Sequence, residues 1–291
     1  MARRIYISTN CFTDRDPDTI LGFCEIYNYQ RIELSAVSAE EEASVALAHS
    51  LRLRGVEVLL HNYYPQPAEP FTLNLASQAA VTLERSRAFC LRALELSAEL
   101  GAPYYAAHAG FTMDLPSQLL GNPAAQASLA GESFWPRAAC LATFAESVRL
   151  LTKHGRKLGV EFLIENHVNA TAGNRAECPL LLCWEAEEIV RMAGMLGGEL
   201  GLLVDFGHLK VSAKSGGFSV MEFMERVGSW IRAFHLSDNS GAADEHEPFD
   251  GEAWFLPVLR QHKEVPCTLE FNRVGHDEIR QTLQVLNNLE C

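Results

Sequence analysis

Metal-binding side chains stand at the ends of successive apolar runs in this sequence. His61 closes the run in "VLLHNYYP", His108 closes the run in "YYAAHAG", and Glu165 ends the run in "FLIENH". Later runs end in the same way, and the whole set is His61, His108, Glu165, Asp205, His208, His235, Asp244, His246 and Glu270. A single histidine or glutamate at such a position is usually a hydrogen-bonded structural residue. Nine of them predict a divalent-metal site, because mixed carboxylate and imidazole sets suit zinc, manganese, iron or cobalt.

The apolar runs also predict the elements that must position these side chains. Short β-rich runs alternate with helical stretches, and we predict strands at 4–9, 31–36, 56–62, 103–109, 160–166, 200–206, 231–237 and 266–272. The run at 160–164 is almost continuously apolar, as expected of a parallel strand covered by helices. The alternation predicts an α/β fold, a single (β/α)8 barrel that spans 1–291 as one domain. A doubly wound open sheet is the alternative, but no glycine-rich phosphate-binding pattern follows the first run.

A barrel would bring the predicted ligands together, because the carboxyl ends of its strands surround one cavity. Longer segments follow the third, fourth, fifth and seventh strands, at 62–75, 110–134, 167–179 and 239–251. We expect these segments to cover the face on which the cavity opens. Several carboxylates in one cavity would repel one another and take up protons unless cations neutralised them. This repulsion is a second reason to expect metal.

Composition restricts the partners and the compartment. The chain has 37 acidic and 24 basic side chains and a formal charge of -13, which has the wrong sign for attraction to nucleic acid. Nucleic acid is therefore not expected as a partner. No apolar run has the length of a secretory signal or a membrane span, so we expect a cytoplasmic protein without a membrane partner. The eight cysteines form no Cys-x-x-Cys pair, which predicts buried reduced thiols.

The strand-end motifs resemble those of a known family. "LIENH", "VDFGH", "FHLSDNSG", "DEH" and "LEFN" are similar to the signatures of the xylose-isomerase-like TIM-barrel superfamily. This superfamily holds sugar isomerases and epimerases together with the type 2 apurinic-site endonucleases. The resemblance to the isomerases and epimerases implies one metal held by Glu165, Asp205, His235 and Glu270. It also implies that Glu165 and Glu270 are the catalytic acid and base, and that His208 contacts the substrate.

The endonuclease branch implies a different use of the same cavity. Its members bind three metals, and the resemblance assigns all nine residues as ligands. The segment "HNYYPQPAEPFTLNLAS" is also similar to that branch, although Tyr63 stands where proline is usual. The segment "HEPFDGEAWF" is one residue longer than the family pattern and has Ala253 in place of its last glycine. These departures leave open whether Asp244 and His246 bind further metals or the substrate.

We therefore carry two enzymatic hypotheses. The first is a metal-dependent isomerase or epimerase that moves a proton on a small sugar or sugar phosphate, with His208, Lys210 and Arg273 as substrate-binding residues. The second is a three-metal phosphoester hydrolase related to the apurinic-site endonucleases but not acting on duplex DNA. Both use a divalent cofactor, with one to three ions of zinc, manganese, cobalt or iron per chain. A non-catalytic metal-binding barrel is a third alternative, and the sequence leaves open whether the protein forms a homo-oligomer.

Overall fold

The computed structural model describes residues 3–35, 41–116, 133–171 and 180–289. Parallel strands alternate with helices and form a near-closed barrel, which confirms the predicted (β/α)8 fold. The eight strands are β1 (Ile5–Ser8), β2 (Arg31–Leu34), β3 (Glu57–Leu60), β4 (Tyr104–His108), β5 (Glu161–Glu165), β6 (Leu202–Asp205), β7 (Ile231–Leu236) and β8 (Cys267–Leu269). Each strand lies within one of the predicted ranges.

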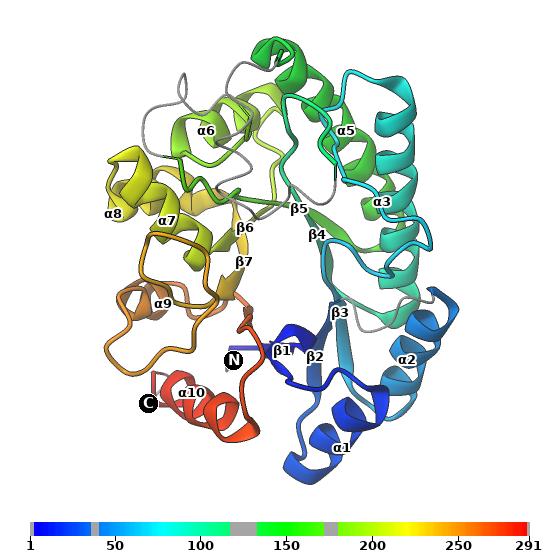
Figure 1. The fold of residues 1–291 in the computed structure, drawn as a ribbon, viewed down its shortest axis with the longest axis vertical. Helices are drawn as coiled ribbons and strands as arrows, with labels where there is room; N and C mark the ends of the chain where they lie inside the picture. The colour runs from blue at the N-terminus through cyan, green and yellow to red at the C-terminus, as the bar shows by residue number, and fades with distance from the viewer. Residues whose placement is uncertain (1–2, 36–40, 117–132, 172–179, 290–291) are drawn as a thin grey trace.

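Helices surround the strands (Figure 1). They are α1 (Pro17–Tyr27), α2 (Glu41–Leu53), α3 (Ala80–Leu100), α5 (Arg137–Leu158), α6 (Ala186–Met195), α7 (Phe206–Gly216), α8 (Val220–Val227), α9 (Leu256–Gln261) and α10 (His276–Asn288), with short 3-10 turns η1 (Thr9–Cys11) and η3 (Gly228–Trp230). Helices α3 and α5 each end at a glycine with positive φ, Gly101 at 73° and Gly159 at 75°. Glycine is the usual residue at such ends because it has no Cβ to strain this conformation.

The order and register of the strands bring side chains from distant parts of the sequence to one level. Hydrogen bonds join the strands in the order β3-β2-β1-β8-β7-β6-β5-β4, and β3 and β4 at the two ends of this order also contact each other. His108 pairs with Glu165 across β4 and β5, and Asp205 pairs with His235 across β6 and β7. Across β5 and β6, Glu165 pairs with Leu203, two residues before Asp205, and all four residues lie at or next to the carboxyl ends of their strands.

Alternation along each strand decides which side chains enter the barrel, because successive residues point to opposite faces. A small inner core contains Leu59, Ala106, Leu163, Leu203 and Ala233. The residues two positions later on the same strands, or just beyond them, are His61, His108, Glu165, Asp205 and His235. The predicted ligands thus share the inward-facing side with this apolar layer and lie one step closer to the carboxyl end.

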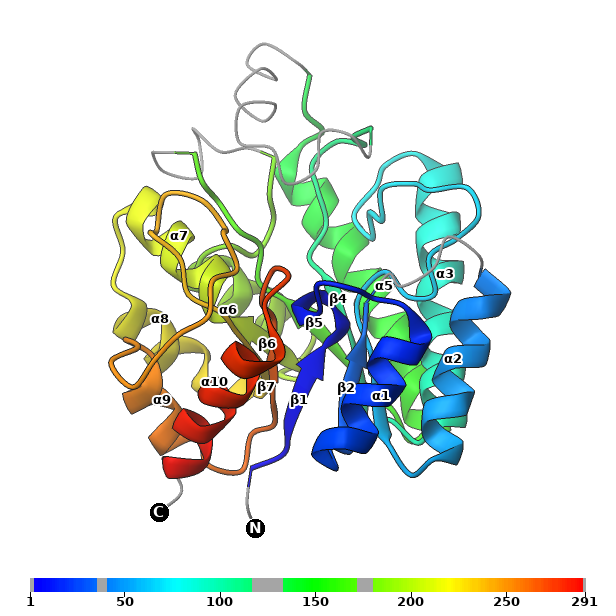
Figure 2. The same cartoon turned by 60° about the horizontal axis from the view of Figure 1, so that its bottom comes forward.

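The opposite strand faces pack against the helices in the main hydrophobic core, as Tyr105, Phe162 and Val204 do. Figure 2 shows both termini at one end of the barrel, with loops that follow the strands extending from the other end. Two stretches of the predicted covering segments, 117–132 and 172–179, lie outside the described residues.

The cysteines of the described ranges agree with the prediction of reduced thiols. Six of them are buried, namely Cys11, Cys24, Cys90, Cys140, Cys183 and Cys267, and the first four of these are free thiols. Cys178 and Cys291 lie outside the described residues. Within the same ranges, no helix combines the length and the apolar character needed to cross a membrane.

Candidate metal centre

Four buried residues form the centre of the candidate site. Glu165, Asp205, His235 and Glu270, hereafter the quartet, each offer one ligand atom, and these atoms all lie within 4.8 Å of one another. His235 Nδ1 lies 2.8 Å from Glu270 Oε2, 3.6 Å from Glu165 Oε1 and 3.9 Å from Asp205 Oδ2. Three carboxylates thus lie around one imidazole nitrogen, and the four residues come from the carboxyl ends of the neighbouring strands β5, β6, β7 and β8.

Several polar atoms of this region are buried without a hydrogen bond. Glu165 Oε2, Asp205 Oδ2 and His108 Nδ1 have no hydrogen-bond partner, and neither does His235 Nδ1, although Glu270 Oε2 is near it. Leaving a buried polar atom unpaired costs about 1 to 3 kcal/mol, and more where the group is charged. A cation bound between these atoms would satisfy all of them. The donor set, three carboxylates and an imidazole, therefore fits a divalent metal.

A second set lies beside the quartet and contains His208, Asp244 and His246. Asp244 Oδ2 is 3.1 Å from His208 Nε2 and 3.0 Å from His246 Nε2. The other ring nitrogens donate to backbone carbonyls, His208 Nδ1 to Asn166 at 2.9 Å and His246 Nδ1 to Glu270 at 3.2 Å. These outer bonds turn both Nε2 atoms toward Asp244, which is how supporting contacts commonly orient metal-binding histidines. The longer loop after β7 therefore still brings Asp244 and His246 to the cavity.

The two remaining predicted ligands join the cluster from β4 and from the residue that follows β3. His108 Nδ1 lies 3.5 Å from Glu165 Oε2, and the two residues form a third set with His208. The His108 ring stacks on His167, with ring centroids 5.3 Å apart. His61 Nε2 lies 3.6 Å from Glu270 Oε1. All nine predicted ligands are thus brought together at one end of the barrel, and their roles as ligands stay a prediction.

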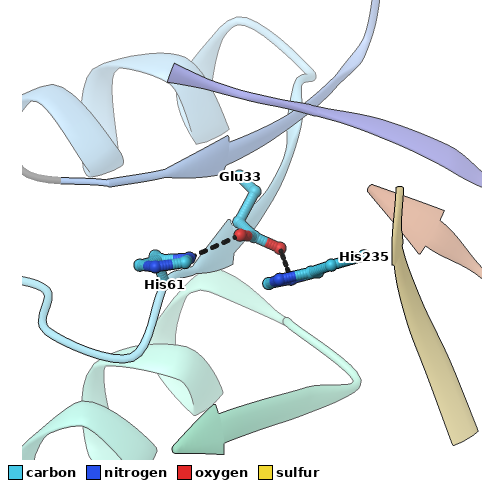
Figure 3. A group of neighbouring side chains, drawn as sticks. All are labelled: Glu33, His61 and His235. Carbon is cyan, nitrogen blue, oxygen red and sulfur yellow. Dashed lines mark hydrogen bonds and ion pairs between the residues drawn. The ribbon is translucent and has the colours of Figure 1, made fainter. Parts of the chain in front are cut away.

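One functional candidate was missed by the sequence reasoning. Glu33 lies in the middle of β2, only 2% exposed, and forms a fourth set with His61 and His235 (Figure 3). The sequence analysis selected residues that end an apolar run, and Glu33 lies within such a run. The signal that could have found it is alternation: its strand neighbours Ile32 and Leu34 pack in the main core, so Glu33 must point into the barrel.

Burial and neighbouring charges shift the pKa values of the clustered side chains in opposite directions. Burial raises the pKa of Asp205 to about 6, although nearby His208 acts to lower it, and burial lowers the pKa of His108 to about 4. Burial also opposes a charge on His246, but the hydrogen bond with Asp244 and the charges of Glu270, Asp244 and Asp205 together outweigh it and raise the pKa of His246 to about 9. Burial acts to raise the pKa of Glu33. The charges and hydrogen bonds of His235 and His61 outweigh burial, and the pKa falls to about 2. In the ion-free protein, protons on histidines therefore balance part of the carboxylate charge.

A cavity of about 590 Å³ opens above this cluster. Its floor and one side contain predicted ligands, including Glu165 and Glu270, and Asn10, Asn62 and Gln66 add neutral polar groups. The apolar residues of the described lining are Tyr63, Pro70, Phe71, Leu73, Phe111, Val168 and Leu181. No lysine or arginine is among the described residues that line this cavity.

The predicted substrate-binding residues differ in their positions. His208 lines the cavity, whereas Lys210 and Arg273 do not belong to its described wall. Lys210 Nζ donates to Asp238 Oδ1 at 2.6 Å, and Arg273 is exposed. Contact of Lys210 or Arg273 with a substrate stays a prediction, and in the ion-free protein Lys210 is held by Asp238.

Comparison with known proteins gives a consistent picture of the fold. A family model described as "Xylose isomerase-like TIM barrel" matches residues 23–289. No curated protein matches the chain.

Solved structures match over nearly the whole length. A D-tagatose 3-epimerase-like protein has a TM-score of 0.67 at 15% identity and covers 99% of this chain and 100% of its own. A Thermus thermophilus protein, TTHB071, soaked with ZnCl2, has a TM-score of 0.64 at 21% identity and covers 99% and 98%. An AP endonuclease of family 2 from Brucella melitensis has a TM-score of 0.64 at 16% identity and covers 95% and 96%. At such identities the likeness concerns the fold.

Proposed function

Because this chain belongs to the xylose isomerase-like TIM barrel family, we propose that it is a divalent-metal-dependent isomerase or epimerase of a small sugar or sugar derivative. The buried histidine and carboxylate sets fit the metal site that such an enzyme needs. The structurally similar D-tagatose 3-epimerase-like protein supports this class of reaction for the fold, although at low sequence identity.

One observation supports the assignment of the acid and base most directly. Within the quartet, Glu165 and Glu270 line the cavity, whereas Asp205 and His235 do not. A bound substrate can therefore reach the two glutamates, while the aspartate and the imidazole face only the interior of the cluster. Two carboxylates that share access to one substrate are suited to remove a proton from carbon and to return one.

The proposed mechanism divides the work between these residues. Glu165, Asp205, His235 and Glu270 would hold a divalent ion, which when bound would supply a Lewis acid that lowers the pKa of the C–H group on the hydroxyl-bearing carbon next to a carbonyl. One of Glu165 and Glu270 takes the proton from that carbon, and a glutamate delivers a proton to complete the isomerisation or epimerisation. His208 faces the same cavity and binds a substrate hydroxyl.

The cavity favours a neutral sugar over a sugar phosphate. Phosphate groups are usually bound by arginine, lysine or helix N-termini. The described cavity wall contains neither of these basic residues, and its residues outside the predicted ligand set are apolar or neutral polar side chains and the buried His167. The formal charge of -13 also opposes the binding of a phosphorylated substrate at long range.

A hydrolase remains the second candidate because of a specific feature, the overlap of the ligand sets. Glu165, His208 and His235 each belong to two of the four sets, so the cluster resembles a site for several ions more than a site for one. Two or three neighbouring ions can activate water and stabilise the leaving oxygen of a phosphoester. The same net charge makes duplex DNA a poor substrate for such a hydrolase.

The test of the first candidate is proton exchange. We expect the metal-loaded protein to incorporate deuterium from heavy water at one carbon of a ketose or ketoglycoside, measured by mass spectrometry over a panel of neutral sugars. Glu165→Gln and Glu270→Gln should each reduce the rate by about 100-fold or more, the usual contribution of a general acid or base. Glu161→Gln is the matched control. Glu161 is an exposed residue of β5, the strand that also contains Glu165, and its side chain forms an ion pair with Arg232.

Metal counting by elemental mass spectrometry separates the two candidates. About three ions per chain, falling in His61→Ala and in His246→Ala, together with turnover of bis(4-nitrophenyl) phosphate and no exchange, would favour the hydrolase. One ion that both variants retain, together with exchange, would favour the isomerase or epimerase.

A further inference from the structure

Glu33 connects two histidines of the cluster from inside the barrel (Figure 3). Its Oε1 accepts a hydrogen bond from His61 Nδ1 at 2.9 Å. Its Oε2 accepts from His235 Nε2 at 3.2 Å and from Thr268 Oγ1 at 2.9 Å. Both oxygens of this buried carboxylate are therefore occupied by side chains from β7, β8 and the residue that follows β3.

These bonds determine which ring nitrogens remain for a metal. An ionised carboxylate only accepts hydrogen bonds, so His61 Nδ1 and His235 Nε2 must each carry a proton. In the neutral imidazole that a metal binds, the lone pair is then left on His61 Nε2 and on His235 Nδ1. Both of these atoms face the quartet, since His61 Nε2 lies 3.6 Å from Glu270 Oε1 and His235 Nδ1 lies 2.8 Å from Glu270 Oε2.

The connection also fixes the orientation of the two rings. The imidazoles are nearly parallel, with an interplanar angle of 12° and centroids 5.6 Å apart. In the order of the strands, β2 is separated from β7 by β1 and β8, so Glu33 reaches His235 across the barrel interior rather than along the sheet. Glu270 also lies near both rings, and the rings themselves are stacked, but Glu33 accepts a hydrogen bond from each of them on the side away from the quartet.

We infer that Glu33 is a positioning residue that holds His61 and His235 in the tautomer and orientation needed to bind a divalent metal. It is absent from the cavity wall, so it does not meet the substrate. This role goes beyond the proposed reaction, because the isomerase or epimerase would need it for His235 and the hydrolase would need it for both histidines, but it does rest on the proposed metal site. In metal sites generally, loss of a carboxylate that orients a ligand histidine weakens the metal 10- to 100-fold.

The decisive variant is Glu33→Gln, tested on the full chain with Co²⁺ as the probe. Glutamine keeps the shape of the side chain but presents an NH₂ group to one of the two histidines, which must then change its tautomer or turn away. We expect the Co²⁺ dissociation constant to rise about 10- to 100-fold. We also expect the number of ions at saturation to stay the same and the visible spectrum of the bound Co²⁺ to change.

A matched control separates positioning from general destabilisation. Glu188 is also fully buried, and it binds Arg137 and the backbone N–H of Cys183 away from the quartet. Glu188→Gln should lower the unfolding temperature of the chelator-treated protein but leave the Co²⁺ dissociation constant unchanged. Glu33→Ala gives a further readout, since formate added to the solution can occupy the place of the missing carboxylate and should restore much of the lost affinity.

Two results would overturn this role of Glu33 while leaving the metal site intact. Equal Co²⁺ affinity in Glu33→Gln and the unsubstituted protein would mean that the histidines do not depend on Glu33. Loss of one ion per chain at saturation, with the others unaffected, would make Glu33 a direct ligand together with His61 and His235. If the unsubstituted protein bound no Co²⁺, both this role and the proposed function would be wrong.

Discussion

At the scale of single residues, protons and metal ions compete for the same nitrogens. His235 and His208 have pKa values well above that of free histidine, because facing carboxylates outweigh the effect of burial. The pKa of His246 is raised to about 9, against the opposing effect of burial. A metal ion can bind these residues only after their protons leave.

Metal binding should therefore depend on pH. We expect the affinity for Zn²⁺ to increase as the pH rises from about 6 to about 9, because His246 loses its competing proton as the pH approaches its pKa of about 9. Calorimetric titrations at about pH 7, in buffers with different ionisation enthalpies, should show proton release for each ion bound. An affinity that stays constant over this range would mean that the histidines are not ligands.

The raised pKa of His246 has the opposite consequence for folding without metal: the protein becomes less stable as the pH rises. The pKa of His246 is higher in the folded chain than its ordinary value of 6.5, so its ion pair with Asp244 stabilises the fold fully below about pH 6.5. This stabilisation is lost as the pH rises through about 9. Chelator-treated protein should unfold more easily at the upper end of this range, and added metal should remove the difference.

The types of the nine residues at the strand ends were sufficient to predict that they meet, because a barrel brings all of its strand ends to one cavity. Glu33 shows where this reasoning stops. Its contacts with His61 and His235 depend on the diameter of the barrel and on which side chains point inward. Neither property can be read from the residues at which the apolar runs end. Likewise, no sequence pattern predicts that Lys210 is held by Asp238.

At the scale of elements, helix α7 must approach the loop after β7 closely to form the second set of ligands. Asp205 ends β6 and caps α7, since its side chain accepts from the backbone N–H of His208 at 2.8 Å. At Gly207, an added Cβ would lie 2.7 Å from Ser237 Oγ, 3.0 Å from Asp244 Oδ1 and 3.2 Å from Asp205 Oδ1. Glycine is thus required here by the small distance between the helix and the metal cluster.

Gly207→Ala should therefore weaken metal binding without removing any ligand. We expect a loss of affinity for Co²⁺ of about 10-fold or more, because the methyl group displaces Asp244 or the first turn of α7. Gly194→Ala in α6 is the control, since an added Cβ there meets no atom within 4 Å. Equal affinities in the two variants would show that the close approach at Gly207 has no role in the site.

The apolar side of the cavity depends on an ion pair between two helices. Arg137 of α5 binds Glu188 of α6 with bonds of 2.7 and 2.8 Å and also donates to the Leu181 carbonyl at 2.6 Å. Phe111 and Leu181 face the cavity and are joined by a backbone bridge. The pair therefore positions the wall that would meet the part of a substrate remote from the metal.

Arg137→Met should destabilise the fold and loosen this wall. Glu188 is fully buried, and leaving a buried charge without its partner costs about 3 to 5 kcal/mol, which urea unfolding would measure. We also expect KM for the substrate to rise more than kcat falls, since the substitution does not touch Glu165 and Glu270, the proposed acid and base. Arg149→Met, an exposed position on the same helix, should leave both quantities unchanged. An unaltered KM in Arg137→Met would separate the ion pair from substrate binding.

At the scale of the whole molecule, the quartet draws its members from the carboxyl ends of β5, β6, β7 and β8. The eight strands were predictable because each is a short apolar run, and their closure into a barrel followed from regular alternation with helices. The residue pairing across strands was not predictable, because the bulge at Leu202/Leu203 shifts the register between β6 and β7. That shift brings Asp205 level with His235.

Removal of metal should consequently affect the stability of the barrel as a whole. A ligand that binds only the folded state adds about 2.7 kcal/mol when its concentration is 100 times its dissociation constant. Buried atoms that have no hydrogen-bond partner, such as Asp205 Oδ2, would also lose their contact with a bound cation. We expect treatment with EDTA to lower the unfolding temperature, and Zn²⁺ to restore it with a logarithmic dependence on concentration. If elemental analysis confirmed complete removal and the unfolding temperature did not change, the ions would not connect the four strands, and the quartet would have to be stable with its protons alone.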